Sequence, residues 1–217
     1  MSRQLTSGVL GRRKKTYLLN FDGVDDYVQI NPTITFGIGQ SLSMWINFNF
    51  TPGATVFYFI GGVSIFYGIG IHEYGFIVFT DQIGVTFCDW TKQDGYQHLV
   101  VTRETSSRYR YFINGVSIGT SLSTSGTGLD LVINRFMRRS DGRYVKGIIS
   151  DFRHYDYELT SSDINNIMQK RAAGDEVGLL EYYRIDEGEG TVTLGEKGGE
   201  GTIFGATWEK AESDFPL

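Results

Sequence analysis

The sequence predicts an all-β fold, an antiparallel jelly-roll sandwich with one short helix after its closing strand. Glycine is frequent, with 28 of 217 residues, whereas proline is rare, with 3, and aromatic residues make up 14% of the chain. This balance favours short strands joined by tight turns. Candidate strands recur at the spacing of about 8–12 residues that is typical of sandwiches and jelly rolls. A chain of this length has room for one such domain with a full core.

The first strands are expected at residues 17–30, with a turn at Asp22-Gly23, followed by residues 42–50 and several short strands within 57–87. In residues 42–50, side chains alternate between two faces. One face holds Leu42, Met44, Ile46, Phe48 and Phe50, and the other holds Ser43, Trp45, Asn47 and Asn49. The apolar face is expected to be core.

Further strands are expected at residues 98–104, 109–114, 116–119, 129–136 and 146–155, and the last 40 residues return to β character. Asn114-Gly115 predicts a tight hairpin, because both residues accept a positive φ. One helix is predicted from a capping box formed by Thr160 and Asp163, and Gly174 is expected to end it.

No Asp, Glu, Lys or Arg occurs from Tyr27 to His72, and residues 54–71 just reach the length of a membrane span. Four glycines and many β-branched and aromatic residues favour short buried strands there instead, so no membrane contact is expected. An aromatic, charge-free surface of this kind is also typical of subunit contacts, which predicts a homo-oligomer.

Charge divides the chain into a basic N-terminal arm, residues 1–16, and one domain, residues 17–217. The arm carries a charge of +5, with Arg12, Arg13, Lys14 and Lys15 in a row, whereas the domain has 15 basic and 25 acidic residues and a net charge of −10. An acidic body argues against nucleic-acid binding by the domain. The arm suits docking onto an acidic neighbouring protein. The first 30 residues hold no apolar stretch of signal-peptide length.

Three segments together resemble laminin-G-like jelly rolls of the concanavalin A-like lectin/glucanase superfamily. They are Leu19-Asn20-Phe21-Asp22-Gly23-Val24-Asp25-Asp26-Tyr27-Val28, the pair Tyr96-Gln97-His98-Leu99-Val100-Val101-Thr102 and Tyr111-Phe112-Ile113-Asn114-Gly115, and Gly147-Ile148-Ile149-Ser150-Asp151-Phe152-Arg153-His154-Tyr155 with the helix start that follows. A further segment, residues 180–191 with 205–208, is similar to one that usually precedes the opening signature. First and last strands of a sandwich lie close together, so we expect it in the same domain.

The resemblance implies one Ca²⁺ ion, held by a carboxylate near the opening strand and another on the closing strand. Asp22, Asp25 and Asp151 are the matching acids. Calcium requires about six to eight oxygen ligands, which backbone carbonyls would complete. Ser150 intervenes before Asp151 where the family often has the acid, which leaves open the direction that Asp151 faces. Asp22 has the alternative role of shaping the Asp-Gly turn.

Catalytic machinery is not evident in the sequence. Glu187 and Glu189 have the spacing of a glycosidase pair but lie in a glycine-rich turn, which holds catalytic geometry poorly. The three histidines show no zinc spacing, and Cys88, the single cysteine, fits a small buried residue. We therefore expect a protein that is not an enzyme.

Glycan binding requires exposed aromatic faces. Trp90 is the first candidate, because it lies in the polar segment 88–96, although it could equally plug one end of the sandwich. Tyr74 and Tyr144 are further candidates, whereas Trp45 and Trp208 fit the core.

The sequence thus predicts a virion surface protein, a head decoration, fibre or tail component, that contacts host or mucosal glycans. Its basic arm would anchor it to other virion proteins, and lysis would release it without a secretion signal. Two alternatives stay open: a purely architectural capsid or tail component without glycan binding, and a carbohydrate-binding module of a bacterial glycan-degrading system.

Overall fold

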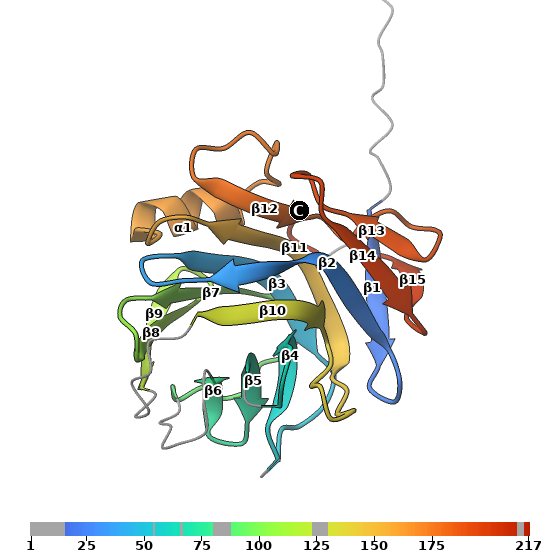
Figure 1. Cartoon of the computed structure of the whole chain (residues 1–217), viewed down its shortest axis with the longest axis horizontal. Helices are drawn as coiled ribbons and strands as arrows, with labels where there is room; N and C mark the ends of the chain where they lie inside the picture. The colour runs from blue at the N-terminus through green and yellow to red at the C-terminus, as the bar shows by residue number, and fades with distance from the viewer. Residues whose placement is uncertain (1–15, 54, 66, 80–87, 123–129, 212–214) are drawn as a thin grey trace, which may run out of the picture.

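The protein is an all-β sandwich of two antiparallel sheets with a single short helix among the residues that the structure describes (Figure 1). The computed structural model describes residues 16–53, 55–65, 67–79, 88–122, 130–211 and 215–217. The two antiparallel sheets and the single short helix confirm the predicted fold class. Arg12, Arg13, Lys14 and Lys15 lie outside the described residues.

The first sheet has eight strands. In order they are β15 (Thr207–Lys210), β1 (Tyr17–Asp22), β11 (Lys146–Tyr155), β3 (Ser41–Phe48), β7 (Gln97–Arg103), β8 (Arg108–Ile113) and β9 (Val116–Leu122), with β12 (Leu179–Tyr183) also paired to β11. β1 and β12 pair with opposite halves of β11, and β3 pairs along both halves. β11 is therefore the long strand to which both β1 and β12 attach.

The second sheet has seven strands. Their order is β13 (Val192–Leu194), β14 (Glu200–Phe204), β2 (Tyr27–Phe36), β10 (Leu131–Phe136), β4 (Phe57–Gly62), β5 (Gly68–His72) and β6 (Gly75–Phe79). β14 pairs with β2 and β15 with β1, so the last strands extend both sheets of one sandwich. Figure 1 shows β13, β14, β15 and β1 gathered at one end of the molecule, with β4 to β6 at another.

The main core lies between the sheets and follows strand alternation. Leu19 and Phe21 of β1, Met44 and Ile46 of β3, and Ile133 of β10 are all essentially inaccessible to solvent. Alternate residues of β1 and β3 consequently face outward from the sandwich.

The outward face of the first sheet is covered over much of its area. The helix α1 (Ser161–Met168) packs Ile164 into a second cluster with Val100 and Phe112. Phe215, near the C-terminus, covers Trp45 in a third cluster. Trp45 is therefore buried on the side of the sheet away from the main core.

Two local predictions are confirmed in detail. Asn114 and Gly115 have φ values of 49° and 80°, as a tight hairpin between β8 and β9 requires. Thr160 and Asp163 form the capping box that starts α1. The predicted helix end at Gly174 is wrong, because α1 ends at Met168 with Gln169 as its C-cap. Arg153 of β11 donates hydrogen bonds to Ile167 O and Lys170 O, which satisfies carbonyls at this end.

Segment 54–71, whose length just reaches that of a membrane span, instead contains β4 and all of β5 except His72. Among the described residues, no helix has both the length and the apolarity to cross a bilayer.

Candidate functional site

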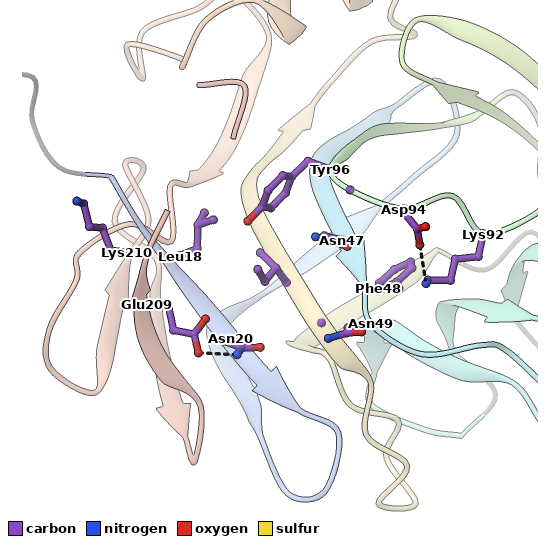
Figure 2. Close-up of a pocket in the computed structure, with 13 residues that line it drawn as sticks. Leu18, Asn20, Asn47, Phe48, Asn49, Lys92, Asp94, Tyr96, Glu209 and Lys210 are labelled. Atoms are coloured by element: carbon purple, nitrogen blue, oxygen red, sulfur yellow. Dashed lines mark hydrogen bonds and ion pairs between the residues drawn. The ribbon is translucent and has the colours of Figure 1, made fainter. Parts of the chain in front are cut away.

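A cleft of about 350 Å³ opens on the outward face of the eight-stranded sheet (Figure 2). Strands β1, β3, β11 and β15 supply its floor and one wall, and the loop before β7 supplies the other wall. Its lining residues are Leu18, Asn20, Asn47, Phe48, Asn49, Lys92, Asp94, Gly95, Tyr96, Gly147, Ile148, Glu209 and Lys210. Cavities of this size are typical of sites for small molecules.

Strand alternation points three asparagines into this cleft. Leu19 and Phe21 face the core, so Asn20 between them faces outward. Phe48 also faces the core, so its neighbours Asn47 and Asn49 point the other way. Figure 2 shows Asn47 and Asn49 between Asn20 on one side and Asp94 on the other.

Gly147 allows β11 and β3 to pack closely together at the floor of the cleft. Gly147 has a φ of 143°, and a Cβ atom there would lie 2.3 Å from Asn47 O and 2.9 Å from Phe48 Cα. Any larger residue would push β11 away from β3. The backbone beneath Asn47 is therefore fixed by close packing of two central strands.

Internal contacts hold the two walls. Asn20 Nδ2 donates a 2.8 Å hydrogen bond to Glu209 Oε1. Lys92 Nζ lies 3.4 Å from Asp94 Oδ1 across the cleft from that pair. Asn47 and Asn49 form no side-chain hydrogen bond with any described residue. Their amides keep both donor and acceptor capacity for a ligand.

One aromatic residue completes the cleft. Tyr96 is half-buried, and its ring meets Phe215 edge to face, with 5.0 Å between the ring centroids. Figure 2 shows Tyr96 above Asn47, pointing across the floor toward Leu18. Amides, carboxylates and an ammonium group beside one half-buried ring are suited to a ligand with several hydroxyl groups and an apolar face.

Trp90 lies in the core, which corrects the expectation of an exposed ring. Only 9% of the residue is accessible, and its ring centroid lies 4.7 Å from that of Phe76 and 6.4 Å from that of Phe48. Trp90 borders a hollow of about 340 Å³ with His72 and Glu73, but aromatic neighbours cover its ring. The alternative interpretation, a loop residue that plugs one end of the sandwich, describes its position.

The other two predicted aromatic residues lie outside the cleft. Tyr74 is 60% exposed and packs against His72, with 4.9 Å between centroids. Tyr144 is half-buried beside Tyr27 and Arg138, on the side of the seven-stranded sheet.

The predicted metal ligands separate into two places. Asp22 and Asp25 lie together with Asp26, and ligand oxygens of all three are within 4.8 Å of one another. Asp151 is instead buried at a bulge of β11, where it pairs with Arg153 and accepts a 2.6 Å hydrogen bond from Tyr182 OH. Asp151 is therefore not a ligand candidate, and Asp26 takes its place in the cluster.

The aspartate cluster also shapes the turn between β1 and β2. Asp22 Oδ1 accepts a hydrogen bond from Val24 N, and Asp26 Oδ2 accepts one from Asp22 N. Burial, together with the charges of Asp22 and Asp25, raises the pKa of Asp26. Asp22 therefore stabilises the turn, which was its alternative role, and also belongs to the cluster of three carboxylates.

Sequence reasoning missed the cleft. Its polar residues were visible as the non-core face of the strand at 42–50, where Asn47 and Asn49 alternate with core positions. The signal was incomplete, because Asn20, Asp94 and Glu209 come from distant parts of the chain and meet only through strand pairing.

Comparisons with known proteins place the fold. Residues 22–165 match the family model of the concanavalin A-like lectin/glucanases superfamily. No curated protein sequence matches the chain. A candidate carbohydrate-binding protein from Bacteroides ovatus superposes with a TM-score of 0.65 at 17% identity, over 92% of this chain and 61% of that one. The chain thus spans less than two thirds of that protein.

Two other solved structures share the architecture. A heptameric SAP-like pentraxin from Limulus polyphemus has a TM-score of 0.53 at 14% identity, over 88% of this chain and 96% of that one. The binding domain of botulinum neurotoxin DC, solved with rat synaptotagmin II, has a TM-score of 0.51 at 17% identity, over 84% and 55%. At these identities the likeness concerns the fold alone.

Proposed function

Because this chain belongs to the concanavalin A-like lectin/glucanases superfamily, we propose that it is a non-enzymatic lectin-like domain that binds a carbohydrate in the cleft on its eight-stranded sheet. The observation that carries the proposal is a set of three asparagines in one cleft with Tyr96: Asn20 on β1, Asn47 on β3 and Asn49 just after β3, the last two without a side-chain partner among the described residues. Sugars present hydroxyl groups that both donate and accept, as asparagine amides do.

The charged residues of the cleft favour binding over hydrolysis. Glycosidases require two carboxyl groups about 5–10 Å apart with different protonation states. Asp94 and Glu209 lie on opposite sides of the cleft (Figure 2), and Lys92 and Asn20 respectively occupy one oxygen of each. Both carboxylates are thereby suited to accept hydrogen bonds from hydroxyl groups.

The test is a glycan array followed by titration calorimetry with the full chain. Asn47→Ala removes a cleft amide without opening the core, and we expect it to weaken glycan binding about tenfold or more. The matched control is Asn166→Ala, which removes an exposed amide from α1. Equal melting temperatures would show that both variants are folded.

Two outcomes contradict the proposal. One is a folded wild-type chain that binds no glycan, which would favour a purely architectural protein. The other is a glycan whose affinity is the same for Asn47→Ala and the wild type, which would place binding elsewhere on the molecule.

We further propose that the aspartate cluster Asp22, Asp25 and Asp26 holds a divalent cation. Three carboxylates within 4.8 Å of one another suit a hard cation such as Ca²⁺, and backbone carbonyls of the turn would supply further oxygens. When bound, the ion would neutralise carboxylates that otherwise repel one another.

As its biological setting we propose a virion surface, with residues 1–16 as anchor to a neighbouring virion protein. The support is charge alone, +5 on the arm against −10 on the rest of the chain. If the setting is right, the chain will co-sediment with infectious particles in a density gradient. Its absence from purified particles would contradict the setting without affecting the lectin proposal.

A further inference from the structure

The seven-stranded sheet carries a local excess of positive charge, whereas the cleft lies on the eight-stranded sheet. Residues 135–143 contain Arg135, Arg138, Arg139 and Arg143 but one acid, Asp141, in a domain whose net charge is −10. These residues span the end of β10 and its connection to β11. The cleft does not use any of them.

Arg138 lies at the centre of this region, among aromatic rings. Its guanidinium carbon is 4.5 Å from the centroid of Tyr27 and 5.4 Å from that of Tyr144. It forms no ion pair with any described residue, and its buried Nε has no hydrogen-bond partner among them. A guanidinium offers five donors, so most of this capacity is open to a ligand.

The aromatic surface continues on the neighbouring strands. Tyr27 of β2 stacks on Phe204 of β14, with 4.5 Å between the ring centroids and 5° between the planes. Phe204 is 42% exposed, although it is large and apolar. Exposed ring faces beside cations provide both stacking and charge pairing.

Internal acids neutralise these arginines only in part. Asp141 is shared, at 3.4 Å from both Arg139 Nε and Arg143 Nε. Arg135 donates to the neutral amide of Asn134. Burial and the adjacent Arg138 charge lower the pKa of the Arg135 guanidinium, so the like charges repel. A bound anion would relieve that repulsion.

We propose that Arg135, Arg138 and Arg143, with Tyr27, Tyr144 and Phe204, form a second binding surface, the arginine–aromatic surface, for an acidic polysaccharide. Sulfate or carboxylate groups of the ligand accept hydrogen bonds from the guanidinium groups. A sugar ring stacks on Phe204. This surface is on the seven-stranded sheet and therefore operates independently of the cleft.

Charge favours a polysaccharide over a nucleic acid. Asp25 and Asp26 come directly before Tyr27, and the backbone at Gly205, next to Phe204, approaches both carboxylates. A continuous phosphate backbone would meet these acids and a domain of net charge −10. An oligosaccharide with separated acidic groups and apolar ring faces fits between the acids and the arginines.

The experiment is calorimetric titration of the full chain with three oligosaccharides of equal length: a heparin fragment, an oligogalacturonate and a neutral dextran fragment. We expect at least one of the two acidic probes to bind more tightly than dextran. Comparing the affinity of the sulfated heparin fragment with that of the carboxylated oligogalacturonate identifies the preferred acidic group. Arg138→Gln/Arg143→Gln should weaken that binding at least tenfold and reduce its dependence on NaCl. Phe204→Ala, at an exposed position, should weaken it with little change in melting temperature.

The matched control is Arg108→Gln/Arg110→Gln, which removes two exposed arginines that both contact Glu104 on the other sheet. It should keep the acidic-oligosaccharide affinity, as should Asn47→Ala, whose effect belongs to the cleft. The proposal is overturned if neither acidic probe binds at 20 mM NaCl or if the control loses as much affinity as the test variant. It is also overturned if single-stranded DNA of equal charge binds as tightly, or if the substitutions change self-association instead.

Discussion

The Asp151 carboxylate pairs with the Arg153 guanidinium two residues further along β11, and both side chains are almost completely buried. Asp151 adopts a positive φ of 53° at a bulge of this strand, and Tyr182 OH donates to its other oxygen. Arg153 extends from this pair to the carbonyls of Ile167 and Lys170. One ion pair thus joins the central strand to the end of α1.

Asp151→Asn should destabilise the protein by about 3–5 kcal/mol, because it leaves the Arg153 charge buried without a counter-ion. Chemical denaturation measures this change. The control is Asp94→Asn, which removes a carboxylate whose side chain is fully exposed and should leave the unfolding midpoint unchanged. The loss should be the same in calcium and in EDTA. A loss of stability that appears only in calcium would indicate that Asp151 is a metal ligand after all.

Trp90→Ala should destabilise the domain by about 3–5 kcal/mol, since it removes a large ring that packs on Phe76 and Phe48. Tyr74→Ala, at a residue that is 60% exposed, should change stability by less than about 0.5 kcal/mol. Denaturation of the two variants side by side checks the contrast. Equal stability of Trp90→Ala and the wild type would mean that the ring is not part of the core.

Patterns within one strand or turn were predictable from the sequence. Alternation identified the core positions of β3, Asn114-Gly115 identified the hairpin, and Thr160 with Asp163 identified the helix start. Each of these features depends on residues within a few positions of one another. Local physical chemistry is sufficient for such features.

Features that depend on distant segments were not predictable. Trp45 is buried on the outward face of its sheet because Phe215 covers it from 170 residues away. Asp151 lies with Tyr182 on the face of the sheet that α1 covers, away from the main core, because a β-bulge changes which face it occupies. The cleft forms because β15 pairs with β1, which brings Glu209 to Asn20.

Calcium should raise the melting temperature of the wild type by several degrees relative to EDTA. An ion that binds only the folded chain stabilises it by about 1.4–2.7 kcal/mol at 10–100 times its Kd. Asp25→Asn should abolish the shift, because Asp25 belongs to the cluster of three carboxylates. The control Asp175→Asn, an exposed acid outside that cluster, should keep it. A calcium shift of equal size in both variants would exclude the cluster as the site.

The stability of the protein should fall as the pH is lowered from 7 to 5, because two buried histidines, His98 and His154, resist protonation in the folded chain. Burial lowers the pKa of His98 from 6.5 to about 3 and that of His154 from 6.5 to about 4. Between 6.5 and these values the unfolded chain binds more protons than the folded chain, so acid favours unfolding. The expected loss is about 2 kcal/mol for each histidine between pH 7 and pH 5.

Denaturation curves at pH 7, 6 and 5 measure this slope for the wild type, His98→Gln and His154→Gln. Glutamine can keep a hydrogen bond to Ser43 in the first variant and to Gln40 in the second. Each substitution should remove about half of the pH dependence, whatever it does to stability at pH 7. If both variants keep the full wild-type slope, other groups must account for the acid sensitivity, and the two histidines would have to titrate alike in the folded and unfolded chains.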